Sequence, residues 1–130
     1  MTIKKITPVL LVDEVEPCVK FWTERLGFEK TVEVPEGGTI GFAMLQKGPL
    51  ELMYQSRASA KKDHAGMARE YGPTHLYIEV DSLLELKRVM QGAPVTVEER
   101  TTFYGAQEIG FEDPGGHVVL FAQFQAVAAN

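Results

Sequence analysis

Two side chains that can exchange protons stand in runs of otherwise apolar, strand-forming residues. Glu51 lies between Leu50 and Leu52, and His75 opens the run His75-Leu76-Tyr77-Ile78. A carboxylate that faces an imidazole across a bound substrate can act as general base while the imidazole acts as general acid. A carboxyl group whose pKa is raised in a pocket would suit proton abstraction next to a carbonyl. Glu51 and His75 are therefore the candidate catalytic pair.

A structural role is the competing interpretation for both residues. Successive side chains of a strand point to opposite faces, so Glu51 lies on the face opposite to its leucine neighbours. That face meets solvent in an ordinary sheet, whereas it is the concave face in a sheet that encloses a cavity. A single strand histidine is also more often structural than a ligand. Three further residues carry weaker signals: His64 in a charged connector, His117 after a glycine pair, and the lone Cys18.

Aromatic residues provide the second chemical signal. Flat rings on a concave sheet face can stack on a planar ligand, and tyrosine hydroxyls can bond to its polar groups. Aromatic residues also favour strands for packing reasons alone. We expect the following residues to line a ligand site: Phe42, Tyr54, Tyr77, Phe103 and Tyr104. The sequence contains no glycine-rich phosphate loop, paired-cysteine zinc motif or Gly-x-Ser-x-Gly elbow.

The elements that must position these residues occur twice along the chain. An apolar run that ends in Val-Asp spans residues 6–13 and again 74–81, and a helix-period segment follows each run and stops at a glycine. Strand candidates then follow at 31–34, 40–45 and 50–54 in the first half, and at 95–98, 107–111 and 118–121 in the second. Each half therefore has the pattern β-α-β-β-β.

The two helical segments share apolar residues at helical spacing, a polar cap and a glycine stop. Asp13 is expected to cap the first helix or to lie in its first turn, and Asp81 or Ser82 caps the second. Gly27 and Gly92 end them. The expected buried faces are Val15, Val19, Trp22 and Leu26 in the first helix and Leu83, Leu86 and Met90 in the second.

Length and composition restrict the class of protein. The chain has 130 residues, of which 45% are hydrophobic and 24% charged, as in an ordinary globular domain. A net charge of −5 argues against a nucleic-acid partner and suits a neutral or cationic small molecule. Cys18 is the only cysteine, and the N-terminal residues contain no long apolar run. We therefore expect a cytoplasmic protein without a disulfide, a secretory signal or a membrane span.

Two segments resemble a known family. Residues 12–28, VDEVEPCVKFWTERLGF, are similar to the first strand-to-helix unit of the vicinal-oxygen-chelate superfamily, in which an aromatic pair precedes a Leu-Gly-Phe helix stop. Residues 104–119, YGAQEIGFEDPGGHVV, resemble its last hairpin, an aromatic-Gly strand followed by Asp-Pro-x-Gly. The superfamily includes glyoxalase I, extradiol dioxygenases, epimerases and bleomycin-resistance proteins. The resemblance spans residues 4–125 and keeps the order of the two halves.

The resemblance implies an α+β fold made of two βαβββ modules. The first module takes about residues 1–55 and the second about 73–130, and the segment 56–72 connects them within a single domain of residues 1–130. In the superfamily, the curved sheets of the two modules enclose one concave cleft, which a homodimer often completes. We therefore expect a shared cleft and a homodimer.

The resemblance also implies where a metal would bind. Enzymes of the superfamily hold one divalent metal with four side chains from four strands, and these positions fall here on Thr7, Glu51, His75 and Leu120. Threonine is a poor neutral ligand and leucine cannot ligate a metal, so only Glu51 and His75 match. We therefore favour no metal or other cofactor, and these two residues leave room only for a weakly bound divalent metal.

The favoured function is a metal-independent, small-molecule-binding protein of the bleomycin-resistance type that sequesters an aromatic or cationic compound. The four family positions and the aromatic residues named above would line its site. The alternative function is an enzyme of the same superfamily, a lyase, isomerase or dioxygenase. Such an enzyme would use Glu51 and His75, with or without a weakly bound metal.

A double variant tests whether the four family positions converge. Thr7→His with Leu120→Glu would bring two histidines and two carboxylates together, a ligand set that suits Ni²⁺, Zn²⁺, Mn²⁺ or Fe²⁺. We expect it to bind one divalent metal per chain far more tightly than the wild type does, as measured by calorimetric titration. Leu120→Glu alone should destabilise the fold, and metal should not restore its stability. Equal, weak binding by wild type and double variant would show that the positions do not converge.

Overall fold

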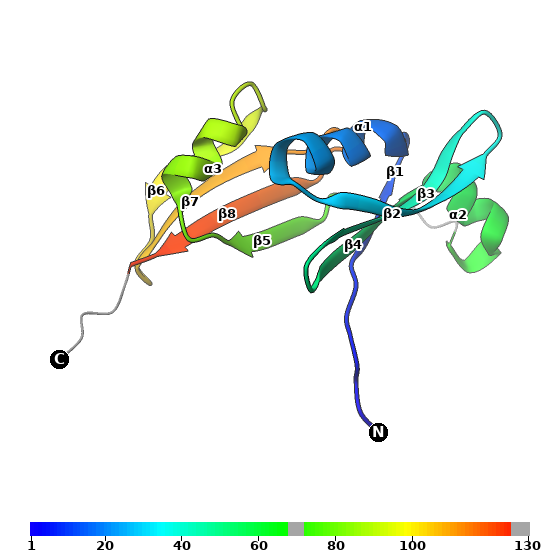
Figure 1. The fold of residues 1–130 in the computed structure, drawn as a ribbon, viewed down its shortest axis with the longest axis horizontal. Helices are drawn as coiled ribbons and strands as arrows, with labels where there is room; N and C mark the ends of the chain where they lie inside the picture. Colours follow the sequence, from blue (N-terminus) through cyan, green and yellow to red (C-terminus); the bar gives the residue numbers. More distant parts are fainter. Residues whose placement is uncertain (68–71, 126–130) are drawn as a thin grey trace. The chain divides into compact units, whose positions relative to one another are not determined.

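The computed structural model describes residues 1–67 and 72–125 of the chain. They divide into two compact units, residues 1–72 and residues 73–130. Each unit contains one four-stranded sheet and a helix that packs against it (Figure 1). None of the helices in the described part of the chain is long and apolar enough to cross a membrane.

The first unit follows the predicted order of elements. Its elements are β1 (Val9–Val12), α1 (Val15–Lys20), a π-helical turn (Phe21–Arg25), β2 (Glu29–Glu36), β3 (Thr39–Lys47), β4 (Leu50–Ser56), α2 (Arg57–Asp63) and a 3-10 turn (Ala65–Met67). The strand order in the sheet is β1-β4-β3-β2, with β1 parallel to β4 and the other pairs antiparallel.

The second unit repeats this topology. Its elements are β5 (His75–Glu79), α3 (Leu83–Val89), β6 (Val95–Thr101), β7 (Ala106–Glu112) and β8 (Val118–Phe124). The strand order is β5-β8-β7-β6, again with one parallel pair, β5 and β8, and two antiparallel pairs. The two orders correspond strand by strand, which confirms the duplicated βαβββ pattern and the α+β fold.

Helix α1 buries an apolar face against β3 and β4, and the turn after it contacts β2. Val15, Val19 and Trp22 are buried as predicted, and so is Cys18, whereas Leu26 is half-buried. The indole nitrogen of Trp22 donates a hydrogen bond of 2.8 Å to the hydroxyl of Tyr54, which connects this helical segment to β4. The first unit thus has its core between α1 and one face of its sheet.

The predicted cap of α1 is wrong, whereas the predicted cap of α3 is confirmed. The N-cap of α1 is Glu14, which makes no side-chain capping bond, and Asp13 instead pairs with Arg57 at 3.0 Å. In α3, the Ser82 hydroxyl accepts a hydrogen bond of 3.1 Å from the backbone N–H of Glu85. Serine satisfies one of the unpaired N–H groups of a first helical turn in this way.

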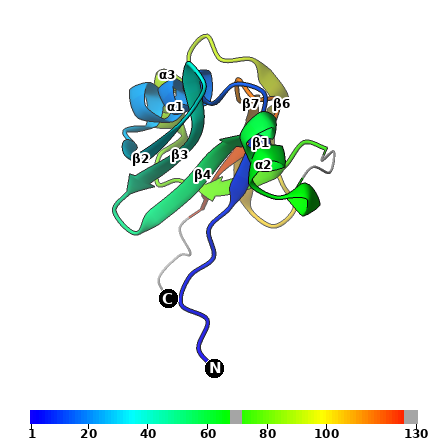
Figure 2. The same ribbon diagram turned by 90° about the vertical axis from the view of Figure 1, so that its right-hand side faces the viewer.

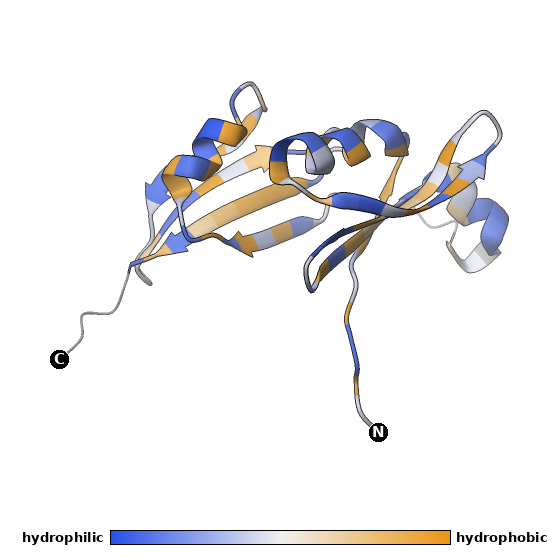
Figure 3. Ribbon diagram, in the orientation of Figure 1, coloured by the Kyte–Doolittle hydropathy of each residue, from blue (hydrophilic) through white to orange (hydrophobic). Residues whose placement is uncertain are grey.

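Helix α3 buries the predicted face, Leu83, Leu86 and Met90. The strand β8 is hydrophobic along most of its length, whereas the helices carry both hydrophobic and hydrophilic residues (Figure 3). Gly27 and Gly92, the predicted helix stops, have φ angles of 73° and 86°. These angles lie in the left-handed region that glycine adopts without strain.

The segment expected to connect the modules contributes to the first unit. Its described part contains α2, which packs against β1, β3 and β4, and Figure 2 shows α2 beside β1. Ala60 of this helix is fully buried, and the Ser56 hydroxyl caps it by accepting a 3.0 Å hydrogen bond from the N–H of Ser59. Residues 68–71 of this connecting segment lie outside the described residues.

A buried histidine joins the start of β5 to the turn between β7 and β8. His117 is 3% exposed, and its Nδ1 accepts a 2.8 Å hydrogen bond from the backbone N–H of Thr74. Asp113 holds the turn itself, because its Oδ1 accepts hydrogen bonds from the backbone N–H groups of Gly115 and His117 at 3.0 and 2.7 Å. His117 therefore has a structural role.

Substitution of His117 should show how much the hydrogen bond between the Thr74 N–H and His117 Nδ1 contributes to the free energy of unfolding. In His117→Leu the N–H of Thr74 loses its acceptor, so we expect the free energy of unfolding to fall by about 1–3 kcal/mol. His117→Asn should lose less, because its amide oxygen can replace Nδ1 as acceptor. Urea denaturation measures both, with His75→Leu, at an exposed histidine, as the control expected to change stability by no more than about 0.5 kcal/mol. A His117→Leu protein as stable as the wild type would contradict this role.

Candidate functional site

The first unit places Glu51 on the sheet face opposite α1. Along β3, the side chains of Ala43 and Leu45 are buried in the core, whereas Gln46 lies on the other face. Cross-strand partners point to the same face of a sheet, and the register pairs Gln46 with Glu51. The same alternation buries Leu52, so the leucine neighbours of Glu51 belong to the other face, as the sequence predicts.

The carboxylate of Glu51 is surrounded by hydrogen-bond donors. Its Oε1 accepts from the Thr7 hydroxyl at 2.8 Å, and its Oε2 accepts from Lys5 Nζ at 3.0 Å and from Gln46 Nε2 at 2.6 Å. The structure therefore brings together two of the four predicted family positions, Thr7 and Glu51. The hydrogen bonds from Lys5 and Thr7 outweigh burial and lower the pKa of Glu51.

This environment stabilises the charged form of Glu51 and places a hydrogen-bond donor on each of its two oxygens. The pKa shift runs opposite to the raised value that would suit a general base near neutral pH. A metal at this carboxylate would compete with the Thr7 and Gln46 donors and would face the Lys5 ammonium. Among residues 1–67 and 72–125, no group of three or more His, Cys, Asp or Glu side chains is placed to hold a metal ion.

His75 and Leu120 lie on the face opposite α3 in the second unit. The parallel register pairs His75 with Val118 and Tyr77 with Leu120, so all four side chains share one face. His75 is exposed and Leu120 half-buried. A Cβ placed on Gly110 would lie 2.8 Å from Leu120 Cδ1, which shows that Leu120 packs directly over this glycine. The convergence of these two residues with Thr7 and Glu51 stays a prediction.

The predicted aromatic residues have different environments. Tyr54 is fully buried in the core beneath α1 and offers no surface to a ligand, so it is not part of the site proposed below. Phe42 is half-buried on the face opposite α1. Tyr77, Tyr104 and Phe103 are 49%, 46% and 100% exposed, respectively. The exposed aromatic residues are therefore concentrated in the second unit.

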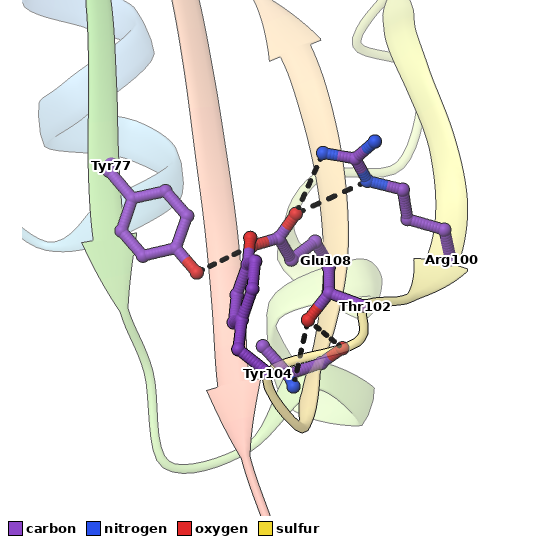
Figure 4. A network of polar contacts seen from close by, with 6 residues as sticks. Tyr77, Arg100, Thr102, Tyr104 and Glu108 are labelled. Carbon is purple, nitrogen blue, oxygen red and sulfur yellow. Dashed lines mark hydrogen bonds and ion pairs between the residues drawn. The ribbon is translucent and has the colours of Figure 1, made fainter.

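A buried glutamate that the sequence analysis missed lies among these rings. Glu108 on β7 is fully buried. Its Oε2 accepts hydrogen bonds of 2.5 Å from the hydroxyls of Tyr77 and Tyr104. Its Oε1 accepts from Nε and Nη2 of Arg100 at 3.2 and 3.0 Å (Figure 4). Donors from β5, β6 and the turn between β6 and β7 thus meet at one carboxylate.

The sequence did contain a signal for Glu108, because it is an acidic residue that precedes the apolar residues Ile109 and Phe111 in a predicted strand. Its cross-strand partner is Ala122, and Gly110 follows two positions later on the same face. This signal is weaker than the one for Glu51, which has a leucine on each side, because Glu108 follows the polar Gln107 and shares its strand face with Glu112. The partners of Glu108, however, come from separate elements and could not be assigned from local spacing.

The network sets the protonation states of its members. Burial raises the pKa of Glu108, but the hydrogen bonds from Tyr104, Tyr77 and Arg100 outweigh burial, so its pKa lies below the ordinary value. Burial and the hydrogen bond to Glu108 raise the pKa of Tyr77. At neutral pH the glutamate is therefore ionised and the Tyr77 hydroxyl keeps its proton.

A tight turn fixes Tyr104 over the carboxylate. The N–H of Gly105 donates to the carbonyl of Thr102 at 3.2 Å, and the Thr102 hydroxyl accepts from the N–H of Ala106 at 3.0 Å. Gly105 has a φ of 85°, a left-handed conformation in which a side chain would be strained. The Tyr104 ring lies 5.1 Å from that of Phe103 and 6.3 Å from that of Phe124, centre to centre. We call Tyr77, Phe103, Tyr104 and Phe124 the aromatic cluster.

The lowered pKa of Glu108 should make the fold sensitive to acid. A carboxyl group with a lower pKa in the folded state stabilises the fold above its unfolded pKa, about pH 4.5. That stabilisation is lost as the pH falls through the folded pKa. Glu108→Gln should therefore flatten the decline of unfolding free energy below about pH 5, measured by urea denaturation at a series of pH values. The matched control is Glu112→Gln on the same strand, and an equally steep decline in Glu108→Gln would contradict the prediction.

Comparison with known proteins agrees with the duplicated fold. The TioX structure from Micromonospora sp. ML1 aligns with a TM-score of 0.77 at 18% identity, over 94% of this chain and 99% of TioX. A lactoylglutathione lyase from Agrobacterium tumefaciens aligns with a TM-score of 0.74 at 16% identity, over 95% of each chain. A bleomycin resistance determinant encoded on the transposon Tn5 aligns with a TM-score of 0.68 at 21% identity, over 95% of this chain and 100% of that one. At these identities the similarity concerns the fold.

The family assignment comes from the sequence itself. A search of curated protein sequences gives no match. The sequence model named Glyoxalase/Bleomycin resistance protein/Dioxygenase superfamily matches residues 3–121. This match covers most of the chain, from before β1 to Phe121 within β8. The chain therefore belongs to the glyoxalase/bleomycin resistance protein/dioxygenase superfamily, the vicinal-oxygen-chelate group that its two motifs resemble.

Proposed function

We propose that this chain binds a small molecule without the help of a tightly bound metal, and that the ligand is aromatic or cationic. The observation that carries the proposal is the aromatic cluster around the ionised Glu108. Each ring of the cluster belongs to a residue at least 39% exposed, and Phe103 is fully exposed. Exposed aromatic residues that lie next to one another mark a binding surface more often than isolated ones do.

The cluster suits a flat ligand for two physical reasons. A planar molecule that stacks on the rings removes apolar surface from water and gains ring–ring contacts. Aromatic faces also attract a cation through their quadrupole. Because Arg100 lies against Glu108, its charge offsets much of the charge of the carboxylate. The rings, rather than an unpaired negative charge, would then supply most of the attraction.

The contacts of Glu51 support binding without a metal. Three donors occupy its two oxygens, and one of them is the Lys5 ammonium. The second family position in this unit, Thr7, uses its hydroxyl as a donor toward Glu51. In the other unit, the apolar Leu120 packs over Gly110. An enzyme that uses Glu51 and His75 is the second candidate function from the sequence, and the lowered pKa of Glu51 does not favour it.

A dye-binding experiment tests the proposal. We expect proflavine, a planar cation, to raise the melting temperature of the wild-type protein. At about 100 times its dissociation constant it should add about 2.7 kcal/mol of stability. Phe103→Ser should weaken binding, because stacking surface is lost. The control is Leu84→Ser, which changes an exposed apolar residue of α3 outside the cluster and should bind as the wild type does.

The metal requirement is measured with the same protein. Binding of proflavine should be unchanged after dialysis against EDTA, and elemental analysis should show no stoichiometric divalent metal. Metal at one equivalent per chain together with loss of binding in EDTA would overturn the metal-independent function. Equal affinity of wild type and Phe103→Ser would instead show that the aromatic cluster is not the site. Sedimentation of the same samples tests the expected homodimer.

A further inference from the structure

We infer that the aromatic cluster accepts only hydrogen-bond donors from its ligand, because Glu108 takes the protons of both tyrosine hydroxyls. This inference rests on the proposed function and specifies the ligand class. The ligand is a planar aromatic compound that presents an N–H or O–H group, such as a protonated primary amine, to Tyr77 and Tyr104. A compound that presents a carboxylate or phosphate there is disfavoured.

The direction of the two hydrogen bonds follows from elementary chemistry. An ionised carboxylate has no proton to give and can only accept. Both tyrosine hydroxyls lie 2.5 Å from the same atom, Oε2 of Glu108, so both must donate to it. A hydroxyl carries one proton. Once that proton points at Glu108, the phenol oxygen has only lone pairs to offer to a ligand.

The surroundings of Glu108 keep this arrangement in place. The residue is fully buried, and its second oxygen is already occupied by two nitrogens of Arg100. A tyrosine that turned its proton toward a ligand would remove a donor from a buried charge, which is costly. The lowered pKa of Glu108 keeps it ionised, and the raised pKa of Tyr77 keeps its proton on the hydroxyl.

The phenol oxygens border the surface that a flat ligand would cover. Tyr77 and Tyr104 are each about half exposed, and their hydroxyls meet at the carboxylate from β5 and from the turn between β6 and β7 (Figure 4). The ring of Tyr104 lies next to those of Phe103 and Phe124. A molecule stacked on these rings therefore has its edge close to oxygens that only accept.

The positive charge of Arg100, which pairs with Glu108, does not reverse the preference for ligands that donate hydrogen bonds. Arg100 contacts Oε1, the carboxylate oxygen that the tyrosines do not use. An anion at the phenol oxygens would meet their lone pairs and the carboxylate beyond them. A donor, by contrast, meets two oxygens whose electron density is increased by their own bonds to a carboxylate. Donors are therefore favoured over acceptors at this point of the surface.

Three naphthalene probes separate charge from hydrogen-bond donation. The first is 2-naphthylmethylammonium, a cation with N–H donors, and the second is its trimethylated analogue, a cation without them. The third is 2-naphthoate, an anion that only accepts. In calorimetric titration of the full chain, we expect the primary ammonium to bind about ten-fold more tightly than the trimethylated cation, the difference that hydrogen bonds to two phenol oxygens can supply. We expect 2-naphthoate to bind most weakly.

Glu108→Gln should reduce the preference because the glutamine amide can donate to a phenol oxygen and release the tyrosine protons outward. The ratio of affinities for the primary and trimethylated ammonium should fall toward one, and 2-naphthoate should gain affinity. Tyr77→Phe and Tyr104→Phe, which remove one acceptor each while keeping the ring, should also lower the ratio. These two variants test the inference even if Glu108→Gln does not fold. The matched control is Phe124→Leu, which removes a ring without a hydroxyl and should weaken both cations equally.

The other possible results would contradict either the preference for hydrogen-bond donors alone or the proposed function as well. Three results would overturn the preference for hydrogen-bond donors and leave the proposed function standing. They are equal affinities for the two cations, the tightest binding for 2-naphthoate, and an unchanged affinity ratio in Glu108→Gln. No binding of any naphthalene probe or of proflavine would overturn both. A dimer that dissociates in Phe103→Ser, with probes binding only to the dissociated form, would show that a second copy of the chain covers the cluster and would overturn both as well.

Discussion

A carboxylate removed from water must be supplied with hydrogen-bond donors, and in the second unit this requirement joins three elements of the sheet. Glu108 takes its donors from β5, from β6 and from the turn between β6 and β7. Because β5 and β6 are the two edge strands of the order β5-β8-β7-β6, one buried charge connects both edges. A slip in the register of any of these strands would leave the charge without a donor, so the network specifies the register as well as the site.

The first unit also supplies a carboxylate with hydrogen-bond donors, but the donor groups are of different types. Glu51 is also held on the face opposite the helix, but its donors are an ammonium, an aliphatic hydroxyl and an amide, from Lys5, Thr7 and Gln46. These flexible polar groups offer little surface for stacking. The donors of Glu108 include two aromatic rings whose faces stay partly exposed. The duplicated scaffold therefore carries two hydrogen-bonded carboxylates, the half-buried Glu51 and the fully buried Glu108, and the second is the one surrounded by groups that suit a planar ligand.

Features that depend on neighbouring residues could be predicted from the sequence. The duplicated topology, the α3 cap at Ser82 and the left-handed stops at Gly27 and Gly92 are all local. Features that depend on distant partners could not. Asp13 pairs with Arg57 instead of capping α1. Tyr54 is a different case, because alternation along β4 already places it on the face of Leu52, opposite Glu51, and the expectation of both at one ligand site conflicted with that pattern. The donors of Glu108 lie 31, 8 and 4 residues away, which no single spacing rule connects.

The position of the second carboxylate also explains why leucine suits position 120. Leu120 pairs with Tyr77 on one side and Gly110 on the other, and Glu108 lies on the same face two residues from that glycine. An acidic side chain at 120 would place a second negative charge beside Glu108 and compete for the hydroxyl of Tyr77, and like charges in one site resist joint ionisation. With an apolar side chain at 120, the Tyr77 hydroxyl has no competing acceptor there and donates its hydrogen bond to Glu108. The apolar Leu120 and the aromatic network around Glu108 are thus two parts of one arrangement, in which phenol and guanidinium groups satisfy the carboxylate.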